Sequence, residues 1–234
     1  MLDERLSMAY SFYVECDLAA DIGTDHGFLP AALLASGRCR RMILTDLSAS
    51  ALENARKEMI RRGLLSRVSL RLGDGLAPLS EPCGVISVMG MGGRTIRDIL
   101  LSGASRLAGA SLILSAHTDL PLIRQAVRDV HYTLDREEPV LAGGRYYLVL
   151  RARPGDWEAD ARTLRLGGPL FRSGSPLLRP YLARRREILQ ERLRGLRSAR
   201  EPNQELIAET LEDIHYYTQF LEDAYDCSRS DAAD

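Results

Sequence analysis

Four short segments of the chain combine glycine with carboxylate side chains in a pattern that suits a nucleoside-like ligand. Residues 21–27 read DIGTDHG, and they are followed by Asp46, by Asp74 with Gly75, and by residues 90–93 (GMGG). Glycine lets the backbone approach a ligand closely, and the first N–H groups of a helix can hold a carboxylate. Carboxylate oxygens accept hydrogen bonds from ribose hydroxyls or from an adenine amino group. These segments are therefore candidate binding residues.

The elements that must position these segments are short apolar strands. Such runs occupy residues 18–22, 42–45, 68–72 and 85–88, and a predicted hairpin follows at 132–150. Strands that alternate with helical patterns predict an α/β fold, a doubly wound, mostly parallel, Rossmann-like sheet with an antiparallel terminal hairpin. In such a sheet, ligands bind beyond the carboxyl ends of the strands, where all four segments lie.

A second part of the chain follows the hairpin. Leu182, Leu189 and Leu193 have coiled-coil spacing, and a second apolar helical pattern comes after Pro202. We therefore expect two regions. They are a ligand-binding domain over residues 1–155, and a linker with an antiparallel helical coiled-coil hairpin over residues 156–234.

Composition excludes several classes of protein. The 234 residues carry a formal net charge of −1, and no apolar run approaches the roughly 20 residues that span a bilayer. The amino terminus lacks the layout of a signal peptide, so we expect a cytoplasmic protein that makes no membrane contact. The four cysteines and four histidines show no metal-ligand spacing, and we predict no metal site.

Arginine is concentrated in one part of the chain. Eight arginines lie between Arg179 and Arg200, and an acidic stretch follows at 201–226. Two interpretations stay open: the arginines form a phosphate-binding face, or they pair with the acidic helix.

Asp25 indicates which nucleoside ligand is bound. It occupies the place where a dinucleotide site would carry a second glycine against the pyrophosphate, and a carboxylate there would repel phosphate. It would attract the ammonium or sulfonium of S-adenosylmethionine, which we predict as the cofactor. Asp46 has a second interpretation, in which it only caps the helix that follows. The predicted cofactor-binding residues are Asp21, Gly23, Thr24, Asp25, Asp46, Leu47, Asp74, Gly75, Gly90 and Met91.

These motifs resemble a known family. Residues 2–6 (LDERL), 20–30 (ADIGTDHGFLP), 73–76 (GDGL), 89–93 (MGMGG) and 168–170 (GPL) look like those of TrmK, the bacterial tRNA (adenine(22)-N(1))-methyltransferases. The resemblance covers almost the whole chain. It implies a class I methyltransferase that uses S-adenosylmethionine to methylate N1 of adenine 22 in the D arm of tRNA, with tRNA as the partner.

Some features leave alternatives open. Residues 115–117 (SAH) replace the Gln-Pro-Asn type segment of the family, and Phe28 stands where the family commonly has tyrosine. Other interpretations are a methyltransferase acting on another nucleic acid or a small molecule, and a non-catalytic tRNA-binding module. The helical hairpin is compatible with a monomer or with a weak dimer formed through it.

Three residues are the candidates for a direct part in methyl transfer. The carboxylate of Asp25 can stabilise the positive charge that appears on the adenine ring, or it can serve only the methionine end of the cofactor. His26 can orient the base or bind a phosphate, or it can be a structural partner of Asp25. Phe28 can stack on an exposed base, or it can be core between helix and sheet.

Overall fold

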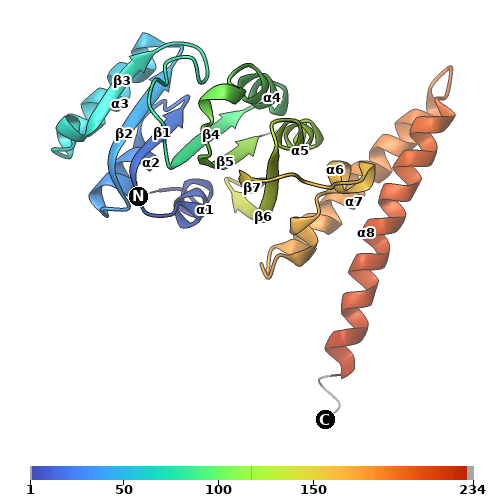
Figure 1. The fold of residues 1–234 in the computed structure, drawn as a ribbon. Helices are drawn as coiled ribbons and strands as arrows, with labels where there is room; N and C mark the ends of the chain where they lie inside the picture. Colours follow the sequence, from blue (N-terminus) through green and yellow to red (C-terminus); the bar gives the residue numbers. More distant parts are fainter. Residues whose placement is uncertain (1, 117, 231–234) are drawn as a thin grey trace. The chain divides into compact units, whose positions relative to one another are not determined.

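The computed structural model describes residues 2–116 and 118–230, with side chains through residue 222. The chain divides into two compact units, Met1–Ser173 and Gly174–Asp234. Unit 1 contains a sheet with helices on both faces (Figure 1).

The sheet has seven strands in the order β3-β2-β1-β4-β5-β7-β6. The first five are parallel, and β7 runs antiparallel to both β5 and β6. The predicted doubly wound sheet with its terminal hairpin is therefore confirmed. The strands are β1 Cys16–Ile22, β2 Cys39–Asp46, β3 Val68–Leu72, β4 Val85–Met91, β5 Ser111–Ala116, β6 Tyr132–Ala142 and β7 Arg145–Pro154.

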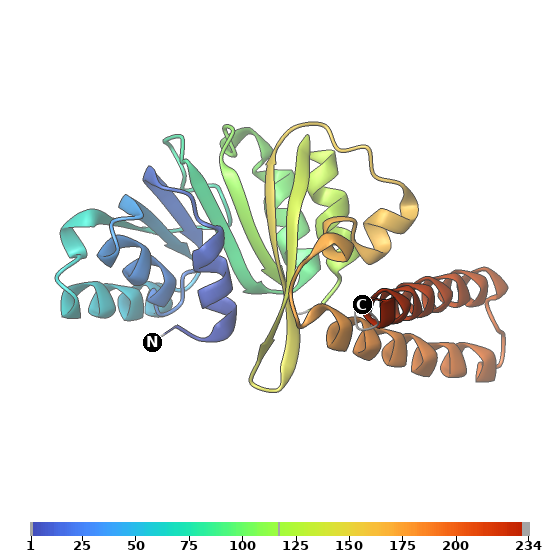
Figure 2. The same cartoon turned by 90° about the horizontal axis from the view of Figure 1, so that it is seen from below.

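Helices cover the two faces of this sheet. Helices α1, α2 and α3 pack on one face and α4 and α5 on the other, which the view in Figure 2 shows most plainly. Central strands are consequently buried on both sides, and β4 opens with Val85, Ile86, Ser87 and Val88 fully enclosed. Burying one such aliphatic side chain stabilises the fold by about 1.5–3 kcal/mol. The helices of unit 1 are α1 Glu4–Phe12, α2 Phe28–Ala35, α3 Ala49–Arg61, α4 Gly93–Ser102, α5 Leu120–Asp129 and α6 Ala161–Leu166.

Helix α1 precedes the first strand and was not among the expected elements. The side chain of Asp3 caps it by accepting a hydrogen bond from the amide of Leu6 at 2.7 Å. Ala9 and Phe12 are buried against the core, while the first turn of α1 remains at the surface. The residues LDERL are thus the start of a helix that lies beside the sheet.

Residues 156–173 belong to unit 1, although the sequence assigned them to the region after residue 155. The cause is a buried ion pair between Arg124 of α5 and Glu137 of β6, with Nε and Oε1 2.6 Å apart. Arg124 also donates to the carbonyl of Arg165 at 2.9 Å, and Glu137 accepts from the amide of Leu170 at 3.2 Å. These bonds tie α6 and the turn after it to the sheet.

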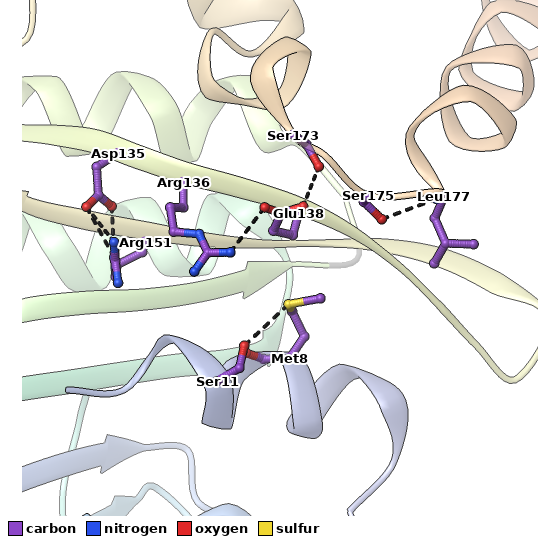
Figure 3. Close-up of polar contacts among 9 residues, drawn as sticks. All are labelled: Met8, Ser11, Asp135, Arg136, Glu138, Arg151, Ser173, Ser175 and Leu177. Atoms are coloured by element: carbon purple, nitrogen blue, oxygen red, sulfur yellow. Dashed lines mark hydrogen bonds and ion pairs between the residues drawn. The ribbon is translucent and has the colours of Figure 1, made fainter. Parts of the chain in front are cut away.

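Two further features complete this attachment. A Cβ atom on Gly167, whose φ is +98°, would lie 2.6 Å from Oε2 of Glu137, so a larger residue would disturb the ion pair. Ser173 donates to the carboxylate of Glu138 on β6, the contact at the end of unit 1 in Figure 3.

Unit 2 consists of helices α7 Leu178–Ser198 and α8 Gln204–Ser230, which pack against each other. Ser175 accepts from the amide of Leu177 just before α7 begins (Figure 3). Arg179 donates to the carbonyl of Leu221 at 2.6 Å and so links the two helices. The helical hairpin is confirmed as predicted. Its buried apolar residues include Tyr181, Leu182, Leu189, Leu193, Ile207 and Tyr217. In the part of the chain that the structure describes, no helix is long and apolar enough to cross a membrane.

Candidate functional site

A cavity of about 960 Å³ opens at the carboxyl ends of the strands in unit 1. It lies where β1 meets β4, at which point the strand order reverses. Open α/β sheets bind their ligands at this position. All twelve residues that the sequence assigned to binding or catalysis line this one cavity: Asp21, Gly23, Thr24, Asp25, His26, Phe28, Asp46, Leu47, Asp74, Gly75, Gly90 and Met91. The structure therefore brings them together, while the role of each stays a prediction.

The loop after β1 is held close to the strands on either side. The amides of Gly23 and Thr24 both donate to the carbonyl of Thr45, at 2.8 and 3.1 Å. Gly23 has a φ of +73°, and a Cβ atom on it would overlap the Cε atom of Met91. The left-handed conformation favours glycine here, and a larger residue would also require the end of the Met91 side chain to move.

Asp21 is the inner end of a buried chain of hydrogen bonds. Tyr13 donates to Ser87 at 2.6 Å, and Ser87 donates to Oδ1 of Asp21 at 2.5 Å. All three side chains are buried. Burial raises the pKa of Asp21 above its usual range, while the hydrogen bond from Ser87 lowers that pKa and so partly opposes the effect. The chain fixes the orientation of the Asp21 carboxyl group at the cavity floor.

Asp46, at the end of β2, joins two loops. Its Oδ1 accepts from the amide of Ser48 at 2.8 Å, and its Oδ2 accepts from the amide of Asp25 at 3.4 Å. Ser48, not Asp46, is the N-cap residue of α3. The interpretation of Asp46 as the cap of this helix is therefore wrong, and its carboxylate instead links the backbone before α3 to the backbone at Asp25. Its two oxygens retain acceptor capacity for a ligand, since a carboxylate offers about four lone pairs.

Asp25, His26 and Phe28 lie together at the cavity mouth. Asp25 has a φ of +47°, which is unusual for a residue other than glycine. Its Oδ1 is 3.7 Å from Nε2 of His26, and both side chains are more than half exposed. The rings of His26 and Phe28 stack with centroids 5.4 Å apart and planes 18° apart.

The interpretation of Phe28 as a core residue is wrong. The side chain is 44% exposed, because α2 turns its first residue toward the cavity and buries the following ones. An exposed, stacked aromatic pair at the mouth of a cavity suits contact with a planar ligand.

The structure adds a wall that the sequence analysis missed. Residues 3–6 at the start of α1 line the cavity, as do Ala142, Gly143 and Tyr147 from the β6–β7 hairpin. The guanidinium of Arg5 lies 5.5 Å from the centroid of the Tyr147 ring. The LDERL motif was the available signal for Arg5, whereas nothing local in the sequence points to Tyr147, because the pairing of distant segments places it there.

The lining residues fit S-adenosylmethionine. In the roles predicted from the sequence, buried Asp21 and exposed Asp25 would provide negative charge for its ammonium and sulfonium groups, and Asp46 and Asp74 would provide acceptors for ribose and adenine. Leu47 is an apolar side chain left exposed on the cavity wall, which suits the face of an adenine ring. Among the residues that the structure describes, no group of three or more His, Cys, Asp or Glu is placed to hold a metal ion. His117, the last residue of the Ser-Ala-His segment at 115–117, lies outside the described residues.

Comparison with known proteins agrees with this geometry. A family model described as a methyltransferase domain matches residues 2–150. The chain belongs to this methyltransferase-domain family. The matched range covers the sheet through most of β7 and therefore includes the whole cavity lining.

Relatives of this methyltransferase domain include members of the family that the motifs resemble. The tRNA (adenine(22)-N(1))-methyltransferase of Bacillus subtilis (strain 168) is 29% identical over 190 residues, which are 80% of this chain and 77% of the relative. Streptococcus pneumoniae Sp1610, a candidate tRNA (m1A22) methyltransferase solved in complex with S-adenosyl-L-methionine, is 26% identical. Its structure superposes with a TM-score of 0.83 over 94% of this chain and 100% of that one.

A third relative extends the likeness of fold. TrmK of M. capricolum, solved with S-adenosyl-homocysteine, is 21% identical and has a TM-score of 0.81, with 95% of this chain and 98% of that one covered. This likeness is one of fold. The predicted resemblance to TrmK proteins is confirmed by the two more similar relatives, at 29% and 26% identity.

Proposed function

We propose that this protein is an S-adenosylmethionine-dependent tRNA methyltransferase that acts in the cytoplasm on N1 of adenine 22 in the D arm. The observation that carries the proposal is the convergence of four strand-end segments on one cavity with a stacked aromatic pair at its mouth. The TrmK relatives supply the substrate class. A cavity that opens to solvent at this pair suits a base presented from a large molecule.

The chemistry requires alignment more than proton transfer. S-adenosylmethionine, when bound, supplies a methyl group made electrophilic by the adjacent sulfonium. Adenine N1 has an in-plane lone pair and needs no general base, so the chain has to hold the base in line and to exclude water. Because N1 lies on the pairing edge, the base must leave its helical stack, and Phe28 with His26 offers a surface on which it can stack.

Asp25 is the residue that we assign to charge stabilisation. Transfer to N1 places positive charge on the adenine ring, and a carboxylate held nearby lowers the energy of that charge. The left-handed backbone at Asp25 and the bond from its amide to Asp46 hold the main chain of this residue at the cavity. His26 then serves as the partner of Asp25 and as half of the stacking surface.

The arginines of α7 are assigned to tRNA attachment. Seven of the eight arginines between Arg179 and Arg200 lie in α7, and arginine is well suited to hydrogen bonding with phosphate. Contacts of this kind are independent of sequence and weaken as salt is raised.

Transfer of a labelled methyl group tests the proposal directly. Unmodified tRNA transcripts incubated with enzyme and labelled S-adenosylmethionine should take up label and stop reverse transcription at adenine 22, and transcripts with guanine at that position should do neither. Calorimetric titration of the protein with S-adenosylmethionine is the separate test of cofactor binding. Binding without label in tRNA would point to another acceptor, and no binding would exclude a methyltransferase.

A further inference from the structure

The cavity has a marked surplus of negative charge. Six carboxylates line it, and among the described lining residues Arg5 is the sole arginine or lysine. A ligand anion is therefore repelled over most of this surface and attracted to one place. The six acidic residues are Asp3, Glu4, Asp21, Asp25, Asp46 and Asp74.

The proposed ligands both carry an anion that must be placed. S-adenosylmethionine ends in a carboxylate, and a nucleotide that enters the cavity from tRNA is flanked by phosphates. Both groups present oxygens in the planar or forked geometry that a guanidinium binds through two parallel hydrogen bonds.

Arg5 is held in position but retains hydrogen-bonding capacity. Its guanidinium stacks on Tyr147 and is only 22% exposed, which restricts its rotamers. Its ion pair with Asp3 is long, with nitrogen and oxygen 3.9 Å apart, so it uses little of the capacity of five N–H donors. A Cβ atom on Gly90 would lie 3.8 Å from Nη1 of Arg5, so the guanidinium reaches the end of β4.

We propose that Arg5 is the anion-binding residue of this cavity and holds either the carboxylate of the bound methyl donor or a phosphate that flanks the target adenine. The inference rests on the proposed function, since it takes its two candidate anions from it. The guanidinium serves the anion and not the reacting ring, because a cation against the adenine would oppose the positive charge that methylation places there.

The competing anion site is the first turn of α2. Its N-cap residue, Gly27, makes no side-chain capping bond, so the first amides of the helix can bind an oxyanion. A helix terminus carries about half a unit of charge, against a full charge on Arg5.

Two cofactor analogues test the first alternative, the carboxylate arm of the proposal, in which Arg5 binds the carboxylate of the methyl donor. The Arg5→Gln variant is titrated with S-adenosylhomocysteine and with 5′-methylthioadenosine, which shares the adenosyl group and sulfur but lacks the amino acid end. If Arg5 holds the carboxylate, the variant binds S-adenosylhomocysteine roughly 10- to 100-fold more weakly than the wild type and 5′-methylthioadenosine equally well.

A neutral linkage tests the phosphate arm. Substrate tRNA is prepared with a methylphosphonate on either side of adenine 22, which removes one charge. If Arg5 holds one of these phosphates, the wild type loses roughly 10- to 100-fold in kcat/KM at that linkage, whereas Arg5→Gln loses as much on native tRNA and nothing more on the neutral one.

Matched variants separate this contact from a general loss of charge. Arg94 is an exposed arginine in the first turn of α4 that lies outside the cavity lining. In Arg94→Gln the neutral linkage should lower kcat/KM by the same factor as in the wild type, because the two changes are independent. Tyr147→Leu removes the ring on which Arg5 stacks and should weaken binding of the same anion as Arg5→Gln does.

A circular dichroism melt first establishes that Arg5→Gln is folded. The proposal is overturned if this variant binds S-adenosylhomocysteine as tightly as the wild type and if, at both positions, the methylphosphonate lowers kcat/KM by the same factor in the variant as in the wild type. The proposed function fails separately, when the wild-type protein methylates no tRNA. In that case the carboxylate arm alone supports or overturns the role of Arg5.

Discussion

Two pairs of opposite charges in unit 1 serve different ends. Arg124 and Glu137 are 2% and 0% exposed and 2.6 Å apart. Both also form hydrogen bonds with backbone groups, Arg124 with the carbonyl of Arg165 and Glu137 with the amide of Leu170. Asp25 and His26 are 70% and 54% exposed and 3.7 Å apart. The first pair is committed to the fold, because water cannot replace either partner. The second adds little to stability, and its groups remain available to a ligand.

The largest expected effect comes from breaking the buried pair. Glu137→Gln should lower the free energy of unfolding by about 3–5 kcal/mol, because it leaves the Arg124 charge buried without a counter-ion. Urea unfolding followed by circular dichroism measures this. Asp129→Asn, which removes the half-exposed partner of Arg128, is the control and should cost less than about 1 kcal/mol.

A double variant sharpens this test. Arg124→Met with Glu137→Leu removes both charges, and its cost should be well below the sum of the two single changes. Equal costs for Glu137→Gln and Asp129→Asn would show that burial does not distinguish the two pairs.

An intermediate effect is expected from the exposed pair. Asp25→Asn should lower the rate of methyl transfer by about 10- to 100-fold, because the neutral amide no longer stabilises positive charge on the ring. The free energy of unfolding should change by less than about 0.5 kcal/mol, since the ion pair is exposed and asparagine tolerates a positive φ. Single-turnover methylation and urea unfolding give the two numbers.

Asp98→Asn provides the control for this change. Asp98 pairs with Arg97 on α4 and does not line the cavity, so its loss should alter neither number. An unchanged rate in Asp25→Asn would remove the electrostatic role.

The smallest effect is expected from the buried hydrogen-bond chain, and it depends on pH. The pKa of Asp21 is raised in the folded protein, so its protonated form favours folding below the unfolded pKa, and that contribution is lost as pH rises through the folded pKa. Ser87→Ala removes a bond that stabilises the carboxylate and raises the pKa of Asp21 further. The variant should lose about 1–2 kcal/mol at pH 7 and less at pH 4.

Tyr13→Phe is the matched control, because it removes the bond to Ser87 and leaves the bond from Ser87 to Asp21. Its cost, measured by urea unfolding between pH 4 and pH 8, should be constant. A constant cost for Ser87→Ala as well would mean that the hydrogen bond does not act through the ionisation of Asp21.

Much of the fold and one side of the site could be predicted from the sequence, because the signals are local. A strand followed by glycine and a carboxylate places Asp21, Asp46 and Asp74 at one edge, and all of them line the cavity. The wall made by Arg5 and Tyr147 could not be predicted in this way, since it depends on how α1 and the β6–β7 hairpin pack in space. The boundary near Ser173 was hidden for the same reason, because a partner 33 residues away, Glu137 to Leu170, decides it.

The buried ion pair of Arg124 and Glu137 also determines the shortest fragment of the chain that is suited to study on its own. A fragment cut after the last strand would expose two charges that the whole protein keeps dry, and it would be expected to aggregate or to remain partly unfolded. A fragment that ends at Ser173 keeps the carbonyls and amides that satisfy them, together with the entire cavity lining. It offers a way to measure how tightly the methyl donor binds when the arginine-rich α7 and the acidic α8 are not present.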